Sequence, residues 1–344
     1  MQRPAANSPA LLVEVRRGGI VESVHRGPVA IVDGTGRMIA SLGDPEMRTF
    51  LRSAAKPFQA MPLLVTGATE AFAFDDQEVA ICCASHHGQP RHTETVAAIL
   101  RRIGQPSTCL LCGTHLPFDE AEAQVLQRSG GKPSVLQHNC SGKHAGFLAA
   151  QVHLGLKPEN YLDPDGPLQR QVLEVARKFS GCDRIDGAID GCSAPNFALP
   201  VSGMARMFAS LASSKPTDDP DLDAARFRIA RAMTTHPDMV SAPGELDTEL
   251  MRAMAGQIVC KIGAEGVWCA GVRATDRWPE GLGIAFKFED GSARARAHVA
   301  LELIRQLGLI DPKSVPSLAR LGRTEQRNHA NLLVGELRVA FRAV

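Results

Sequence analysis

Strand-like segments occupy both ends of this chain, and segments with helical spacing fill its middle. The strand-like segments alternate apolar and polar residues, and an Asp-Gly-Thr-Gly sequence at residues 33–36 is typical of a hairpin turn. Because strands must pair, this order predicts an α+β fold in which N-terminal and C-terminal strands form one sheet around a helix-rich middle. The predicted strand regions cover residues 10–15, 20–25, 29–40, 266–272, 282–288 and 332–341.

The middle of the chain reads as a series of amphipathic helices. Residues 77–84 are an exception, because this short apolar run ends in Ser85-His86-His87-Gly88 and is interpreted as a strand followed by a site loop. A chain of 344 residues with 44% hydrophobic content is long enough for a large core, so we expect one domain over residues 1–344 with a flexible leader at 1–9. The predicted helices cover residues 94–103, 145–154, 167–179, 200–211, 221–234, 248–256 and 293–307.

Charge and cysteine content exclude several classes of protein. A formal net charge of +1 gives no electrostatic reason to bind nucleic acid or an anionic membrane, so a small-molecule partner is expected. The first residues lack the apolar core of a secretory signal, and no apolar run is long enough to span a bilayer. Nine cysteines without a signal indicate reduced thiols, so we expect a cytoplasmic protein.

The densest chemistry lies at residues 137–146, where a thiol, a hydroxyl, an amine and two imidazoles stand between glycines. Cys140 there and Cys192 downstream both sit in polar, glycine-containing loops, which is unusual for a structural cysteine. If the two loops meet, the thiolates suit a zinc ion, with Lys143, Asp190 or water completing a tetrahedron. Two other readings stay open, in which one cysteine is a nucleophile activated by a nearby histidine, or both cysteines simply pack.

A second candidate site is the Ser-x-x-Lys sequence at Ser53 and Lys56. On a helix this spacing places both side chains on one face, where a desolvated lysine can take the serine proton and create a nucleophile. Ser129 and Lys132 match the same pattern, but their Gly-Gly spacer is unsuited to helical alignment. The spacing therefore favours Ser53 as the reactive serine.

Two further cysteine pairs are interpreted as structural. Cys109 and Cys112 have metal or redox spacing, yet their Leu-Leu interior and the lack of a second such motif favour a buried strand. Cys82 and Cys83 lie inside an apolar run and are expected to pack in the core.

Five motifs follow one another along nearly the whole chain. They are Ser53-x-x-Lys56-Pro57, Cys83-Ala84-Ser85-His86-His87-Gly88, His138-Asn139-Cys140-Ser141-Gly142-Lys143-His144, Asp190-Gly191-Cys192-x-x-Pro195 and Lys261-x-Gly263-Ala264-Glu265-Gly266. In this order they resemble the rhizobial-type (class 3) L-asparaginase family, also called asparaginase II-like. The resemblance implies a homodimeric amidohydrolase that converts L-asparagine to L-aspartate and ammonia, on a fold similar to serine β-lactamases and penicillin-binding proteins.

The resemblance also implies roles for individual residues. Carried over by motif, two catalytic pairs would be Ser53 with Lys56 and Ser85 with Lys261. A zinc ion beside them would be held by Cys140, Lys143 and Cys192, and substrate-binding positions would be Arg52, His86 and Asp190.

One segment departs from the family pattern. Where an Ala-Gly-x-x-Arg-x-Asp-Thr-like sequence is expected, residues 241–248 carry Glu245 in place of the arginine. This change bears on how a substrate carboxylate is bound, and so on the choice between asparagine and glutamine. Two rival classes also remain: a β-lactamase-like or penicillin-binding serine acylase, which lacks a Lys-Thr-Gly triplet here, and a non-enzymatic zinc-binding protein.

Overall fold

The structure, a computed structural model, describes residues 8–344, so residues 1–7 of the predicted leader lie outside the described part. The chain divides into two compact units. Unit 1 contains the described residues up to Ala54 together with Leu199–Ser213 and Cys260–Val344. Unit 2 contains Ala55–Ala198 and Ser214–Val259. The single domain expected from the sequence stays a prediction.

Unit 1 pairs strands from the two ends of the chain, as the sequence indicates. The first strand β1 runs antiparallel to the last strand β12, with Val13 opposite Val339 and Val15 opposite Leu337. Strand β3 likewise pairs with β10, with Ile31 opposite Ile284. The expectation of one shared sheet is wrong, because these strands form two sheets, ordered β11-β12-β1-β2 and β4-β3-β10-β9-β8. The strands are β1 Ala10–Arg17, β2 Ile20–Gly27, β3 Val29–Asp33, β4 Met38–Leu42, β8 Ile258–Gly263, β9 Val267–Val272, β10 Leu282–Lys287, β11 Glu325–Arg327 and β12 Leu333–Val339.

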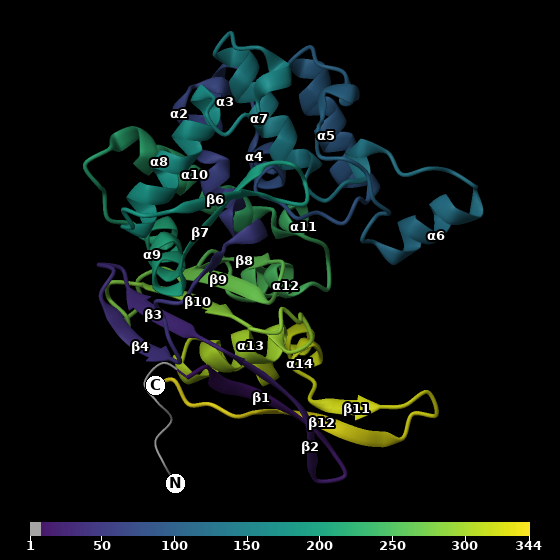
Figure 1. The fold of residues 1–344 in the computed structure, drawn as a ribbon, viewed down its shortest axis with the longest axis vertical. Helices are drawn as coiled ribbons and strands as arrows, with labels where there is room; N and C mark the ends of the chain where they lie inside the picture. Colours follow the sequence, from purple (N-terminus) through teal and green to yellow (C-terminus); the bar gives the residue numbers. More distant parts are fainter. Residues whose placement is uncertain (1–7) are drawn as a thin grey trace. The chain divides into compact units, whose positions relative to one another are not determined.

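Two helices pack on the five-stranded sheet of unit 1 (Figure 1). Helix α9 (Val201–Ala212) lies against β3, β9 and β10, and helix α13 (Arg296–Gln306) contacts β9 and β12. The approach of α9 depends on glycine, since a Cβ on Gly283 of β10 would lie within 2.7 Å of the Ala209 methyl group and still closer to the Ala205 carbonyl oxygen. Apolar strands β3, β9 and β10 are fully buried as a result. Unit 1 also contains α14 Pro316–Leu321, the short strand β5 Arg48–Phe50, and the 3-10 turns η1 Arg52–Ala55, which ends in unit 2, and η5 Pro312–Ser314.

Unit 2 is mainly helical, and its core forms where α4 (Asp76–Cys82) packs on α7 (Ser141–His153) and α10 (Pro220–Thr235). The other elements are α1 Lys56–Gln59, α2 Met61–Val65, α3 Ala68–Ala71, α5 Pro90–Arg102, α6 Glu120–Arg128, α8 Pro167–Ser180, α11 Pro237–Val240, α12 Leu246–Ala253, η2 Ser107–Cys109, η3 Val135–Gln137, η4 Pro158–Asn160 and β6 Asp186–Ile189, which pairs with β7 Pro195–Pro200 at the unit boundary. These bounds confirm the helices predicted at 94–103, 145–154, 167–179, 221–234 and 248–256.

Two sequence interpretations in unit 2 are wrong. Residues 77–84 form helix α4 and not a strand, because Asp75 and Glu78 make a capping box that starts a helix. Their apolar run is continuous since the helix is buried on all sides, which removes the usual amphipathic signal. Cys109 ends a 3-10 turn and Cys112 follows in an irregular segment, so the predicted buried strand is absent there.

None of the helices in residues 8–344 has the length and apolar character needed to cross a lipid bilayer.

Candidate functional site

Lys56 is the centre of a buried polar cluster in unit 2. It is the first residue of α1, and only 1% of its surface is exposed. Its Nζ donates to the Ala84 carbonyl oxygen at 2.6 Å, lies 2.9 Å from Ser85 Oγ, and lies 3.5 Å from the Asn139 carbonyl oxygen. The two carbonyls can only accept hydrogen bonds. A neutral Lys56 amine would therefore give both of its N–H groups to them and direct its lone pair at the Ser85 hydroxyl, as a general base must.

The Ser85 loop is fixed by main-chain hydrogen bonds on both sides. Helix α4 ends at Cys82, and residues 84–89 follow without regular secondary structure. The Ser85 N–H donates to the Val240 carbonyl at 2.9 Å, and the His86 N–H donates to the Asn139 carbonyl at 3.2 Å. The Ser85 loop is thus held on one side by the last residue of α11 and on the other by the segment that leads into α7.

His86 links two loops of the site and is fully buried. Its Nδ1 accepts the Gly88 N–H at 3.2 Å, so Nε2 carries the proton and donates to Ser141 Oγ at 2.8 Å. The Ser141 hydroxyl in turn donates to the Leu136 carbonyl at 2.9 Å. Burial lowers the pKa of His86 well below its ordinary value, and this ring therefore stays neutral. Its expected role in substrate binding stays a prediction.

The structure brings Cys140, Lys143 and Cys192 together inside unit 2, and all three are buried. Lys143 Nζ donates to Cys192 Sγ at 3.2 Å. A hydrogen bond with Cys192 is the main reason that the pKa of Cys140 lies well below its usual range, and the charges of Lys56 and Lys143 act in the same direction. Burial would lower the pKa of Lys143, but the adjacent cysteines outweigh it and raise that pKa. The three side chains therefore form a thiolate–ammonium cluster.

The donors in this cluster fit a borderline metal ion such as Zn²⁺. Two thiols and one amine converge, and thiolates are preferred zinc ligands. In residues 8–344 no group of three or more His, Cys, Asp or Glu side chains is arranged to hold a metal, so the amine of Lys143 would have to serve as the third ligand. Because an ammonium cannot coordinate, Lys143 would lose a proton when the metal binds.

Two histidines near the thiols are poor candidates for a catalytic base. Burial lowers the pKa of both His138 and His144 to about 4. His138 Nδ1 accepts the Cys140 N–H at 3.0 Å, and His144 Nδ1 bonds to the Tyr161 hydroxyl at 2.7 Å. A group whose conjugate acid has a pKa near 4 accepts a proton weakly at neutral pH. A hydrogen bond with Cys192 raises the pKa of His144 but does not offset its burial, so the low pKa values of both rings disfavour the cysteine–histidine alternative.

Two residues beside the thiolate–ammonium cluster were not predicted from the sequence to be part of the site. Tyr161 accepts the Leu111 N–H at 2.7 Å, and burial raises the pKa of this hydroxyl. Burial is the main reason that the pKa of Cys112 is raised to about 12, and the neighbouring Cys140 and Cys192 act in the same direction. Tyr161 is the only tyrosine in the chain, and that rarity was the one signal available.

The remaining predicted catalytic residues lie in unit 1. Ser53 and Arg52 belong to the turn η1, and Arg52 has a positive φ of 53°. Lys261 lies on β8, is fully buried, and donates to the Ile262 carbonyl at 3.2 Å. A Cβ on Gly263 would lie 2.5 Å from the Leu51 carbonyl oxygen, so glycine allows the segment before Ser53 to approach β8. The Ser53–Lys56 and Ser85–Lys261 pairings stay predictions.

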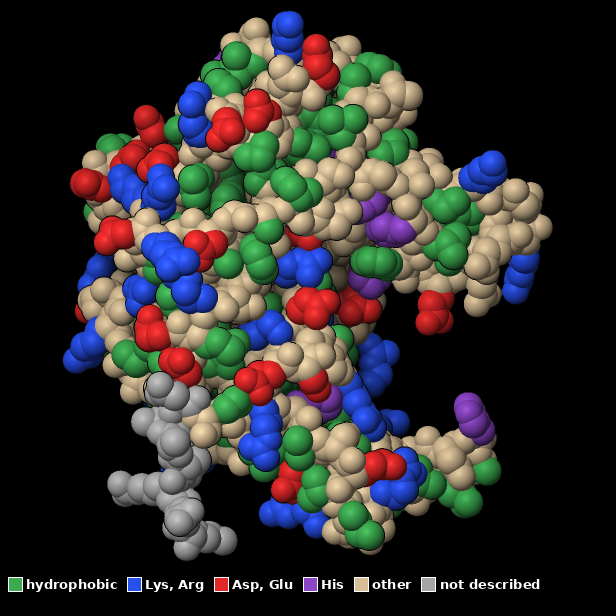
Figure 2. Space-filling view, in the orientation of Figure 1, with side chains coloured by type: hydrophobic (Ala, Val, Ile, Leu, Met, Phe, Trp, Pro, Cys, Tyr) green, Lys and Arg blue, Asp and Glu red, His purple; other side chains and the backbone are tan. Residues whose placement is uncertain are grey.

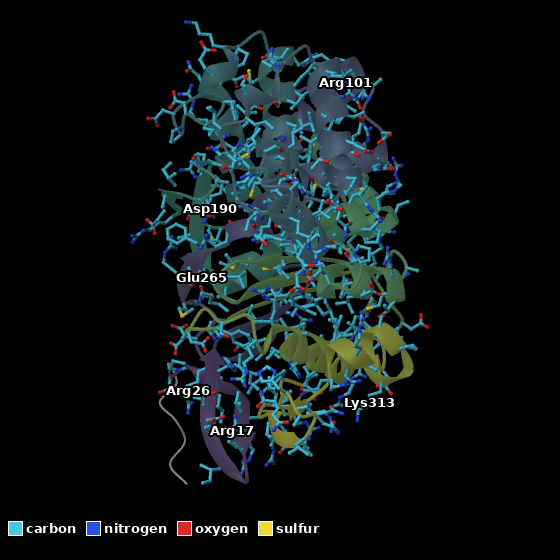
Figure 3. All side chains as sticks on the ribbon, turned by 90° about the vertical axis from the view of Figure 1, so that its right-hand side faces the viewer. Arg17, Arg26, Arg101, Asp190, Glu265 and Lys313 are labelled. Carbon is cyan, nitrogen blue, oxygen red and sulfur yellow. The ribbon has the colours of Figure 1, made fainter. Side chains whose placement is uncertain are left out.

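Asp190, labelled in Figure 3, follows β6. Its N–H donates to the Ala194 carbonyl at 2.9 Å. This main-chain bond closes the loop that carries Cys192. The charge of Asp190 also contributes to the raised pKa of Lys143, which places the carboxylate within electrostatic reach of the thiolate–ammonium cluster. Its role in substrate binding is a prediction.

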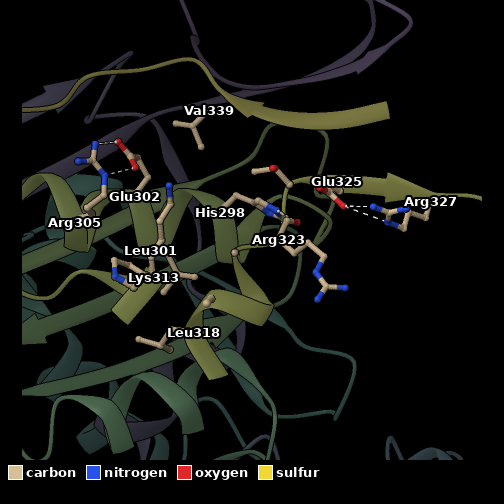
Figure 4. A pocket seen from close by; sticks show the side chains of 14 residues that line it. His298, Leu301, Glu302, Arg305, Lys313, Leu318, Arg323, Glu325, Arg327 and Val339 are labelled. Atoms are coloured by element: carbon tan, nitrogen blue, oxygen red, sulfur yellow. Dashed lines mark hydrogen bonds and ion pairs between the residues drawn. The ribbon is translucent and has the colours of Figure 1, made fainter. Parts of the chain in front are cut away.

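The hollow drawn in Figure 4 belongs to unit 1 and has a volume of about 630 Å³. His298, Leu318, Arg323 and Val339 are among the residues that line it, and the Arg323 carbonyl accepts a 2.9 Å hydrogen bond from His298 Nε2. None of the predicted catalytic, metal or substrate-binding residues lines this hollow.

The sequence profile of the L-asparaginase II family matches residues 13–339. The chain belongs to the L-asparaginase II family. This confirms the resemblance seen in the five motifs, and membership supports an amidohydrolase activity on a small-molecule amide. No protein with a curated function matches this L-asparaginase II family member.

Solved structures with some likeness to this family member are glutaminases. One is a probable glutaminase from Bacillus subtilis complexed with 6-diazo-5-oxo-L-norleucine, with 14% identity and a TM-score of 0.40 over 82% of this chain and 84% of that chain. Another is a Bacillus glutaminase, with 12% identity and a TM-score of 0.37 over 82% of this chain and 91% of that chain.

Proposed function

We propose that this protein hydrolyses L-asparagine to L-aspartate and ammonia by acyl transfer through a serine activated by lysine. The observation that carries the proposal is the 2.9 Å contact between Lys56 Nζ and Ser85 Oγ inside a buried cluster of a chain that belongs to the L-asparaginase II family. The family resemblance further supports a homodimer and a fold of the serine β-lactamase and penicillin-binding-protein type, and both form part of the proposal.

In the proposed first step, Ser53 Oγ attacks the side-chain amide carbon and its proton passes through the Ser85 hydroxyl to the neutral amine of Lys56. The tetrahedral intermediate collapses, the C–N bond breaks, and the leaving nitrogen takes the proton from Lys56 and departs as ammonia. Water then attacks the aspartyl ester, Lys56 accepts its proton, and the proton returns to the serine as aspartate leaves. Ser85 and Lys261 would relay protons in both steps, and Arg52, His86 and Asp190 would bind the substrate.

We also propose that Cys140, Lys143 and Cys192 hold one Zn²⁺ ion. A bound zinc ion would supply fixed positive charge beside the site and orient the substrate. The serine nucleophile needs no metal hydroxide, so each proton transfer above is assigned to side chains of the protein. Support comes from the buried contact of 3.2 Å between Lys143 Nζ and Cys192 Sγ.

The substrate preference is tested by measuring ammonia release from asparagine and from glutamine. Ring hydrolysis of a β-lactam is measured in parallel. We expect the highest kcat/KM with asparagine, a lower value with glutamine, and no hydrolysis of the β-lactam. Glu245 makes the glutamine comparison informative, since it stands where the family pattern has arginine. Activity on none of the three compounds would contradict the proposed function and favour a zinc-binding role.

Zinc content is the measurement that tests the metal site. Elemental analysis of purified wild-type protein is expected to give about one zinc per chain. Cys140→Ala or Cys192→Ala is expected to weaken zinc binding by at least about 10-fold, because loss of a direct ligand costs at least as much affinity as loss of a residue that only supports a ligand. Cys182→Ala is the matched control, because Cys182 Sγ is bonded to the Ser180 carbonyl in a different part of unit 2. Equal zinc content in all four proteins would contradict the site.

A further inference from the structure

His115, in the irregular segment before α6, contacts the peptide unit of Asn139. The Asn139 N–H donates to His115 Nε2 at 3.1 Å, and Asn139 Oδ1 lies 3.2 Å from the same nitrogen. Because a backbone N–H can only donate, Nε2 is assigned as the acceptor nitrogen of the ring. The proton is then on Nδ1, which donates to the Leu116 carbonyl at 2.5 Å. Both ring nitrogens are thus used, and the imidazole is fixed between its own segment and the chain that enters α7.

Asn139 carries this contact into the Lys56 cluster. Its carbonyl oxygen accepts the His86 N–H at 3.2 Å and lies 3.5 Å from Lys56 Nζ. Its side-chain Oδ1 lies 3.4 Å from Cys140 Sγ. One residue therefore contacts the proposed base, the Ser85 loop and a proposed zinc ligand, and His115 holds that residue from the outer side.

Aromatic contacts fix the plane of the His115 ring. Phe118 stacks on it with ring centroids 4.7 Å apart at 16°, and the His138 ring lies 4.3 Å away at 54°. His138 in turn accepts the Cys140 N–H. Figure 2 shows histidine side chains gathered on the surface of unit 2 where the segment bearing α6 begins.

The segment that carries His115 is also attached to the loop after Ser85. The Asp119 N–H donates to the His87 carbonyl at 3.0 Å, and Gln89 Nε2 donates to Asp119 Oδ2 at 2.7 Å. Residues 115–119 therefore hold both loops that contact Lys56, although Phe118 itself is 52% exposed.

We propose that His115 is a positioning residue for amide hydrolysis: by accepting the Asn139 N–H, it holds the Asn139 carbonyl where it orients Lys56. This inference rests on the proposed function above. His115 would not touch the reacting atoms, and its effect would reach them through Asn139 and Lys56. Loss of its acceptor nitrogen should reduce kcat with little change in KM, because Lys56 moves protons and does not recognise the substrate.

Two substitutions separate positioning from packing. His115→Gln keeps an acceptor oxygen near the place of Nε2, whereas His115→Leu leaves the Asn139 N–H without a partner. We expect His115→Leu to lower kcat by about 10- to 100-fold, as misplacement of a catalytic group does, and to change KM by less than about 3-fold. His115→Gln should recover most of the lost kcat. His153→Leu is the control, since this histidine lies at the exposed end of α7 and contacts Phe72.

Amide hydrogen exchange provides a readout that is independent of turnover. In His115→Leu, the amides of Asn139 and His86 should exchange faster than in the wild type. The Asn139 N–H loses its acceptor, and the His86 N–H depends on the position of the Asn139 carbonyl. His115→Gln should restore slow exchange. If the wild type lacked asparaginase activity while exchange behaved this way, the proposed function would fail and the positioning of Asn139 would stand. Equal loss of kcat in both His115 variants, or full kcat in His115→Leu, would overturn the proposal.

Discussion

Ser53→Ala is expected to lower kcat for asparagine hydrolysis by about 10⁴-fold or more, since removal of a catalytic nucleophile leaves only binding and charge stabilisation. KM should change little. The protein should remain folded, because Ser53 is half-buried in the turn η1 and its side chain fills little volume. Steady-state ammonia release and a thermal melt are the two measurements required.

The chain supplies its own control for this experiment. Ser129 precedes Lys132 with the same spacing as Ser53 and Lys56, but it is exposed at the end of α6, where its Oγ donates to the Leu126 carbonyl at 2.8 Å. Ser129→Ala should therefore leave kcat unchanged. If spacing alone produced the effect, both serine variants would lose activity.

Ser85→Ala decides which serine forms the ester. Ser85 Oγ is 2.9 Å from Lys56 Nζ, and removal of a proton relay is expected to cost about 10²- to 10⁴-fold in kcat. Hydroxylamine added during turnover should give aspartyl hydroxamate with the wild type and with Ser85→Ala, and none with Ser53→Ala. Hydroxamate from Ser53→Ala but none from Ser85→Ala would identify Ser85 as the nucleophile and contradict the proposed order.

Lys56→Met is expected to reduce kcat by at least about 10³-fold, because the methionine side chain has a similar length and no proton-accepting nitrogen. Lys56→Arg should be equally inactive, since a guanidinium stays charged and cannot act as a base. The Met variant would also leave the Ala84 carbonyl without its partner, which costs about 1–3 kcal/mol of folding free energy for a buried acceptor.

Comparison with Lys132→Met separates these effects. Lys132 is exposed, so its replacement should change neither kcat nor the free energy of unfolding measured in denaturant. We expect Lys56→Met to lower both kcat and the free energy of unfolding. A Lys56→Met variant with low kcat and full stability would show that Lys56 has a purely catalytic role. Retention of more than about a tenth of wild-type kcat in Lys56→Met would contradict the assignment of Lys56 as the base.

Much of the fold could be predicted because local patterns and tertiary structure agree. The Asp-Gly-Thr-Gly turn does join β3 to β4, and the last apolar run does become β12. The prediction failed for α4 because a fully buried helix and a buried strand have the same apolar sequence, and the capping box at Asp75 and Glu78 was the signal that distinguished them.

The site could be predicted in part from its motifs. Cys140, Lys143 and Cys192 lie together in unit 2, which meets the condition that the sequence analysis set for a zinc site, and their role as zinc ligands stays a prediction. The partners of Lys56 could not be read from local spacing, because Ala84, Ser85 and Asn139 are 28, 29 and 83 residues away in the chain. Asn139 acts through its main-chain N–H and carbonyl groups, and a main-chain contact leaves no mark on the residue type.

The single tyrosine has a use that follows from where it lies. Tyr161 is buried, and its hydroxyl joins His144 to the Leu111 N–H beside Cys112. Protein made with fluorotyrosine would give one fluorine resonance, with no assignment problem, from a nucleus next to the thiolate–ammonium cluster. Metal uptake, substrate binding and opening of the segment at residues 115–119 would each be recorded as a change in that one line, in solution and with Tyr161 as the one residue altered.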